Sequence, residues 1–192
     1  MAARTPLTVN ALVLVSALVL VSSIAAQSRG ETYTATASIK TAGGASLTAP
    51  VAIDVTGWTS EADRKRLAGV LKSGGDAALQ KQLAAMKTLG KITVGKTEFD
   101  AKYAYAMTSS EGRIITVVTT TPMFFVGAGA PGAAPKDKDG HPFGIVTIEV
   151  NDAGSGRGTL TPAASVKMSD SDAIIVQDYS VELVTLPDVR KK

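Results

Sequence analysis

The sequence predicts an α+β fold: a curved antiparallel β-sheet or open barrel of about eight strands, with a two-helix hairpin packed on one face. Three observations support this. Much of the chain after residue 30 alternates apolar and polar residues with the two-residue period of half-buried strands. The connections are mostly short turns, which suit antiparallel neighbours because parallel strands need long crossovers. One stretch, 60–90, changes to the helical period.

Residues 1–26 have the three parts of a secretory signal peptide. Arg4 is the only charge, 11–21 is apolar, and small residues lead up to Ala25 and Ala26, after which we expect cleavage. An uncleaved membrane anchor is the alternative, but a spanning helix needs roughly 20 mostly apolar residues. The sequence thus predicts an exported protein, periplasmic or extracellular in a bacterial envelope, with no membrane span after cleavage.

Residues 27–192 are enough for a single α+β domain with its own core. The chain has 20 Lys and Arg against 17 Asp and Glu, a net charge of +3. This balance does not favour nucleic acid as a partner. The sequence has no cysteine, so disulfides cannot stabilise the exported domain and apolar burial must do so.

Two strands are predicted first, followed by the helices. Ser60 is a good helix N-cap, and leucines at helical spacing follow it. Gly74 and Gly75 are expected to end the first helix, and Gly90 the second. The expected strands are 33–40, 46–55, 92–94, 99–107, 113–120, 143–150, 158–168 and 173–186, with a flexible loop at 127–141 and a solvated basic tail at 187–192.

Several of these turns resemble those of a group of exported bacterial proteins to which no activity is attached. The residues that carry the resemblance are Gly57-Trp58-Thr59-Ser60-Glu61, Gly74-Gly75, Gly90-Lys91-Ile92 and the hairpin 154–160. The resemblance spans roughly 51–186, and the Gly/Ala/Pro-rich loop 127–135 departs from it. It implies export and no particular chemistry.

The best motif match is to the nucleotide-binding P-loop, in Gly90-Lys91-Ile92-Thr93-Val94-Gly95-Lys96-Thr97. A P-loop follows a strand and opens a helix, so that backbone amides cradle phosphate. Here a helix precedes the motif and a strand follows it. The segment is therefore interpreted as a strand with a tight turn, and no nucleotide is expected.

Metal sites and other cofactors are not expected either. His141 is the only histidine and is interpreted as a solvated loop residue. Asp137 and Asp139 imitate part of a calcium loop, but positions 1 and 12 of that loop would be Pro135 and Val146, whose side chains cannot chelate. No catalytic residue is predicted.

Aromatic residues are the candidates for a binding site. Trp58 lies at the strand-to-helix junction, Tyr103 and Tyr105 are expected on one strand face beside Phe99, and Phe124 and Phe125 open the loop. Trp58, Tyr103, Tyr105, Phe124 and Phe125 could line an apolar pocket between sheet and helices, with ordinary core packing as the alternative.

The sequence does not establish a function. The leading hypothesis is a non-catalytic exported domain that binds a partner protein or a small apolar ligand. One alternative is an envelope hydrolase whose site is assembled from distant Asp, Lys, Tyr and Ser residues. The other is a structural accessory domain without a cleft.

Overall fold

The computed structural model describes residues 30–40, 46–123, 140–168, 174–179 and 183–192. The predicted signal peptide, Phe124, Phe125 and most of the predicted loop 127–141 lie outside these residues. No helix in the described part of the chain is long and apolar enough to cross a membrane.

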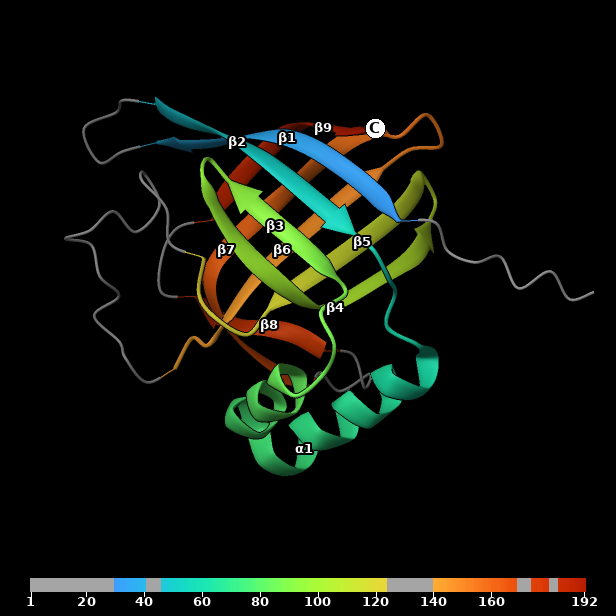
Figure 1. Cartoon of the computed structure of the whole chain (residues 1–192), viewed down its shortest axis with the longest axis vertical. Helices are drawn as coiled ribbons and strands as arrows, with labels where there is room; N and C mark the ends of the chain where they lie inside the picture. Colours follow the sequence, from blue (N-terminus) through green and yellow to red (C-terminus); the bar gives the residue numbers. More distant parts are fainter. Residues whose placement is uncertain (1–29, 41–45, 124–139, 169–173, 180–182) are drawn as a thin grey trace, which may run out of the picture.

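The described residues form nine antiparallel strands, eight of which close into a barrel (Figure 1). The barrel order is β1-β2-β3-β4-β5-β6-β7-β9, closed by pairing of β6 with β7 and of β9 with β1. The predicted antiparallel barrel is confirmed, and it is closed rather than open. The strands are β1 (Glu31–Lys40), β2 (Ser46–Val55), β3 (Gly90–Val94), β4 (Thr97–Ser109), β5 (Gly112–Thr119), β6 (Phe143–Val150), β7 (Ser155–Met168), β8 (Ile174–Tyr179) and β9 (Val184–Lys191).

The ninth strand, β8, extends the sheet beyond the barrel. Its register with β7 runs from Ala164↔Tyr179 to Met168↔Ile174. The register of β9 with the other half of β7 runs from Ser155↔Arg190 to Leu160↔Val184. The two halves of β7 therefore have different partners, and β8 lies next to the helix rather than in the barrel wall (Figure 1).

The barrel interior is filled by apolar side chains from all eight strands. Tyr33, Ile53, Ile115, Ile148 and Leu186 are all 0–1% exposed and belong to one continuous cluster. An eight-stranded barrel is just wide enough for side chains to fill its inside. The interior is therefore the main core of the molecule.

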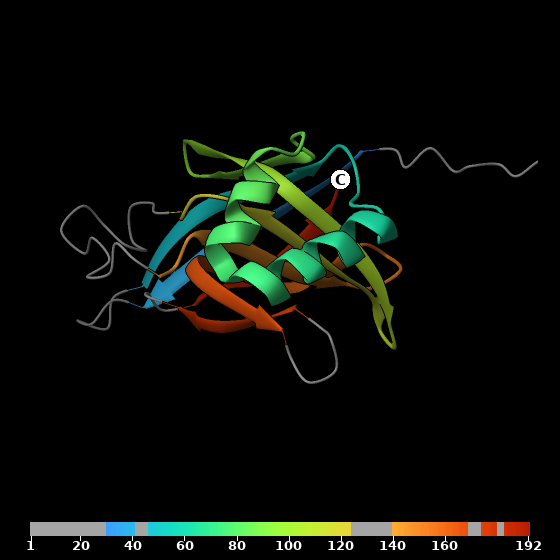
Figure 2. The same cartoon turned by 90° about the horizontal axis from the view of Figure 1, so that it is seen from below.

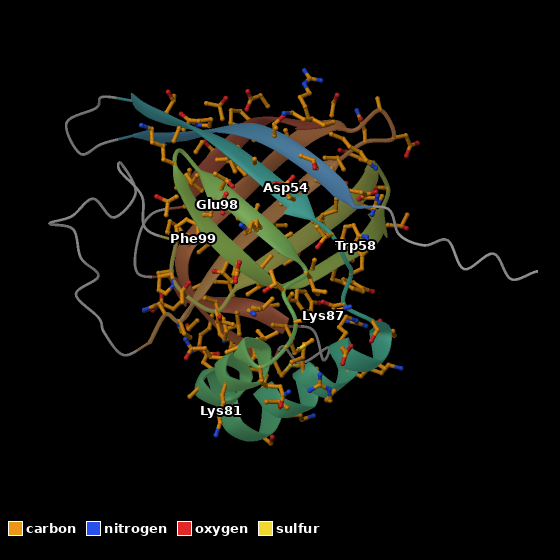
Figure 3. All side chains as sticks on the ribbon, in the orientation of Figure 1. Asp54, Trp58, Lys81, Lys87, Glu98 and Phe99 are labelled. Carbon is orange, nitrogen blue, oxygen red and sulfur yellow. The ribbon has the colours of Figure 1, made fainter. Side chains whose placement is uncertain are left out.

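One helix, α1 (Glu61–Ala84), lies across the outside of this barrel (Figures 1 and 2). Ser60 caps it as predicted, because its hydroxyl accepts a hydrogen bond from Asp63 N at 3.0 Å. Leu67, Leu71, Leu79 and Leu83 are buried at helical spacing and pack on the barrel's outer face. Lys81 lies on the side of α1 that faces away from the barrel (Figure 3).

The predicted two-helix hairpin is wrong, because the described residues contain a single helix. Gly75 alone leaves helical geometry, with φ 65° and ψ −164°, and the helix resumes directly after it. Such dihedrals are open to glycine and very unfavourable for other residues. The two glycines therefore bend one helix sharply and do not form a loop between two antiparallel ones.

Two other expectations are settled by the strands. The segment 90–97 forms β3, a turn with Gly95 at φ 62° and the start of β4, as the interpretation of the P-loop motif required. The predicted tail 187–192 is not a free tail, because β9 extends to Lys191 and pairs with β1 and β7, although its side chains other than Val189 are exposed as expected.

Candidate functional site

A β-bulge in β4 turns two tyrosines to the outside of the barrel. The register of β4 with β5 shifts between Ala101↔Thr119 and Tyr103↔Val118, so Lys102 is an extra residue. Before the bulge Phe99 and Ala101 face the interior, and after it Ala104 does. Tyr103 and Tyr105 share a face as predicted, with ring centroids 6.4 Å apart, but Phe99 lies on the opposite face.

The same stretch of β4 anchors both ends of α1. Thr59, just before the helix, exchanges two hydrogen bonds with Ala104: Thr59 N donates to the Ala104 carbonyl at 2.7 Å, and Ala104 N donates to Thr59 Oγ1 at 3.1 Å. After the helix, Lys102 Nζ donates to the Met86 carbonyl at 3.2 Å. The bulge thus supplies a side chain that holds the far end of the helix.

The bend of α1 is anchored as well, on β7. Asp76 follows Gly75, and its two carboxylate oxygens accept hydrogen bonds from Val166 N at 3.3 and 3.2 Å. Val166 lies at a register shift of the β7–β8 ladder, so its amide is directed to Asp76. Burial raises the pKa of Asp76, and the hydrogen bond from Val166 opposes part of that rise. The helix is fixed at three places along its length.

A cleft of about 280 Å³ remains between this fixed helix and the barrel's outer wall. Small-molecule sites usually measure roughly 300–1,000 Å³, so the cleft is just below that range and suits a small ligand. Most of its walls are aliphatic. The helix contributes Arg64, Leu67, Ala68, Leu79 and Leu83, and the strands contribute Tyr103, Tyr105, Met107, Thr116, Val118, Phe143, Ile145, Thr147, Val166, Ile174, Ile175 and Val176.

Part of the rim remains apolar and exposed. Met107 is 53% exposed and Ile175 40%, and Ile174 and Val176 beside it are similar. Large apolar side chains gathered on a surface often mark a binding site. Here they continue the lining of the cleft onto β8.

Among the described residues that line the cleft, Arg64 is the charged one. Its Nε and Nη2 donate to the two carboxylate oxygens of Glu61 at 2.9 and 2.8 Å. The guanidinium lies over the ring of Tyr105, 5.0 Å from its centroid. Burial raises the pKa of Tyr103 to about 12, so its phenol is neutral at ordinary pH.

The predicted aromatic site is only partly brought together. Tyr103 and Tyr105 line the cleft. Trp58 does not, because it packs against the barrel core with Arg113 over its ring at 5.4 Å, in the segment that joins β2 to α1 (Figure 3). Phe124 and Phe125 lie outside the described residues.

A second polar cluster lies at one end of the barrel, where it links β1, β5 and β9. Glu31 accepts hydrogen bonds from Tyr33 Oη at 2.8 Å, Arg113 Nη1 at 3.0 Å and Lys191 Nζ at 2.7 Å. Burial alone would raise the pKa of Glu31, but its hydrogen bonds with Lys191, Arg113 and Tyr33 outweigh burial and lower that pKa to about 2. Its members form hydrogen bonds with one another, and the cluster is interpreted as structural.

His141 is the remaining candidate from the sequence, and its predicted solvation is wrong. Its side chain is only 10% exposed, and Nε2 lies 3.5 Å from Asp178 Oδ2 of β8. Within the described residues, no group of three or more His, Cys, Asp or Glu side chains could hold a metal ion.

Sequence reasoning missed Arg64 and the three exposed apolar residues of β8 that line the cleft. Arg64 precedes the buried Leu67 by three positions, a spacing that places both on one face of a helix. That signal was available, although Arg64 begins the basic run 64–66, and such a run usually belongs to the solvated face of a helix. The contribution of β8 depends on its docking beside α1, which no local pattern indicates.

Comparisons with protein-family models, with curated proteins and with solved structures find no match for this chain. The interpretation of the cleft therefore rests on its own geometry.

Proposed function

We propose that this protein is a non-catalytic binding protein that holds a small, mainly apolar molecule between α1 and the outer wall of the barrel. The observation that carries the proposal is the 280 Å³ cleft, with its aliphatic walls and few polar groups. Sites for small molecules have this composition, because burial of apolar surface supplies affinity and a few polar groups set orientation.

The fixed position of α1 favours a preformed site. A helix that closed only over its ligand would have few contacts without it. Here four leucines pack on the barrel, and hydrogen bonds involving Thr59, Asp76 and Lys102 fix the helix along its length. A preformed site loses little conformational freedom when the ligand enters, which favours affinity.

A hydrolase is less well supported by the same cleft. Its described polar lining consists of Arg64, Tyr103, Tyr105, Thr116 and Thr147. The phenol of Tyr103 has a raised pKa, which makes it a poor base near neutral pH. A hydrolytic site would need a nucleophile beside a base, and these described residues do not supply that pair.

We propose that the protein acts outside the cytoplasm, because residues 1–26 combine one charge, an apolar stretch and small residues before Gln27. Sequencing of the N-terminus of the protein from the envelope fraction should give Ala26 or Gln27. A membrane-bound form that begins at Met1 or Ala2 would contradict cleavage.

The binding proposal is tested by calorimetric titration of the purified protein with decanol, a neutral single-chain probe. We expect saturable binding with one molecule per chain. Ala68 lines the cleft, so Ala68→Phe should fill it and weaken decanol binding at least tenfold.

The matched control is Ala62→Phe, which adds the same ring to an exposed residue of the same helix that does not line the cleft. It should bind decanol like the wild type. Equal binding by all three proteins, or none by any of them, would refute the proposed site.

A further inference from the structure

Arg64 is the only charged residue among the described residues that line the cleft. Its side chain is 38% exposed, so the guanidinium lies at the boundary between the apolar walls and solvent. A single fixed positive charge in this position has one obvious complement. It fits a ligand whose apolar body fills the cleft and whose anionic group lies at the rim.

The Glu61 pair leaves most of the guanidinium available. Arginine carries five N–H donors in a planar fork, and the pair with Glu61 uses one on Nε and one on Nη2. Three further donors are left over by this pair. They can bind a carboxylate or phosphate at a second edge of the fork.

Tyr105 holds the guanidinium over the cleft lining. The 5.0 Å stacking distance lies within the range of a cation–π contact. The fork is therefore oriented before a ligand arrives, which lowers the entropy lost on binding. The pKa of Tyr103 is about 12, so its phenol is neutral at ordinary pH and adds no negative charge that would repel an anion.

Glu61 is a replaceable partner. Its side chain is 50% exposed and it lies three residues before Arg64 on the same helix. Exposed pairs of this kind contribute little to stability, because water and salt screen them. A ligand anion held next to apolar walls is screened less, so it competes well for the same guanidinium.

We propose that Arg64 selects ligands that carry an anionic group on a single apolar chain, with the chain in the cleft and the anion on the guanidinium. This inference rests on the proposed binding function and adds the chemical class of the ligand. The anion can be a carboxylate or a phosphate, since both match the fork of arginine.

The test compares decanoate and decyl phosphate with neutral decanol by calorimetry at pH 8. We expect at least one of the two anions to bind about tenfold more tightly than decanol, and the better anion identifies the head group. Arg64→Gln should remove this preference, so that neither anion binds more tightly than decanol to this variant. Added salt should weaken the anions and leave decanol unchanged.

Glu61→Gln gives a second, independent readout that does not remove the arginine. The variant takes away the competing carboxylate, so affinity for the preferred anion should rise several-fold while decanol affinity stays constant. Arg64→Lys should keep part of the preference, because lysine supplies the charge without the fork.

The outcomes separate the two proposals. Equal affinities for decanol and both anions in the wild type would refute selection by Arg64 and leave the binding function standing. An unchanged preference in Arg64→Gln, or unchanged anion affinity in Glu61→Gln, would refute it as well. No binding of any probe would refute the binding function itself.

Discussion

The inside and the outside of this barrel are both apolar, but only the inside is filled. Interior side chains such as Ile53, Ile148 and Leu186 are 0–1% exposed. On the outer face, the leucines of α1 meet Phe143 and Ile145 and still leave a cleft of about 280 Å³. The difference follows from geometry, since a closed eight-stranded barrel pulls its inner side chains together, whereas a bent helix touches a convex wall at a few points.

This comparison favours a site on the outside of the barrel over one in its interior. Room inside would require the removal of large residues such as Tyr33 and Leu160, both 0% exposed. The outer face already has room, an exposed apolar rim and one charged group. The barrel then serves as a rigid wall, and α1 defines the shape of the site.

The largest expected effect comes from truncating an interior leucine. Leu186→Ala should lower the free energy of unfolding by about 3–5 kcal/mol, because it removes buried contacts and leaves a cavity in a closed wall. Leu83→Ala, on the cleft side, should cost about 2 kcal/mol, since its surroundings can relax into space that already exists.

Urea denaturation of both variants measures this difference. The comparison requires that the free energy of unfolding depends on urea concentration with the same slope in both variants. A Leu83→Ala loss as large as that of Leu186→Ala would show that the helix side is packed as tightly as the barrel core. Such a result would contradict the comparison on which the site is based.

The next effect concerns the ionic cluster that closes one end of the barrel. Glu31→Gln should cost about 2–3 kcal/mol near neutral pH, because Arg113 and Lys191 lose a charged acceptor in a partly buried place. The pKa of Glu31 is lowered to about 2 from 4.5, so the stability it contributes is present above about pH 4.5 and is lost as pH falls toward 2.

Melting temperatures of wild type and Glu31→Gln between pH 7 and pH 2 test this dependence. The gap between the two proteins should be widest at neutral pH and narrow as the pH approaches 2. A gap that stays constant over the whole range would mean that the charge of Glu31 does not contribute to the closure of the barrel.

Local patterns predicted most strands, the N-cap Ser60 and the leucine stripe of α1, because each depends on neighbouring residues. Closure depends on contacts across the whole chain, such as Tyr33↔Lys191 between β1 and β9. The alternation of β9 is interrupted by Pro187, and its basic residues suggested a solvated tail. The role of β9 in closing the barrel follows from its pairing with β1, which no local pattern indicates.

The candidate site was predicted in part for a related reason. Phe99, Ala101, Tyr103 and Tyr105 alternate without a break in the sequence, so the pattern predicted that all share one face. The bulge at Lys102 places the small Ala101 and Ala104 inside the barrel and the tyrosines outside. A bulge leaves no compositional mark here, and the site therefore could not be assembled from the strand pattern alone.

The smallest effects come from two glycines of α1, and they should have opposite signs. Gly69 lies in the part of α1 before the bend, with open space around it. Gly69→Ala should therefore stabilise the protein by about 0.5–1 kcal/mol through better helix propensity. Gly75 has φ +65°, so Gly75→Ala should destabilise by about 1–2 kcal/mol, because a side chain strains that backbone.

The same two variants test whether decanol binding depends on the bend in α1. Gly75→Ala should also weaken decanol binding, since the bend directs Asp76 to Val166 N and sets the width of the cleft. Gly69→Ala should leave decanol binding unchanged, because it alters neither the bend nor the lining. Stabilisation by both substitutions would mean that α1 is a straight helix in solution, and the cleft beneath it would then lack the shape on which its proposed function depends.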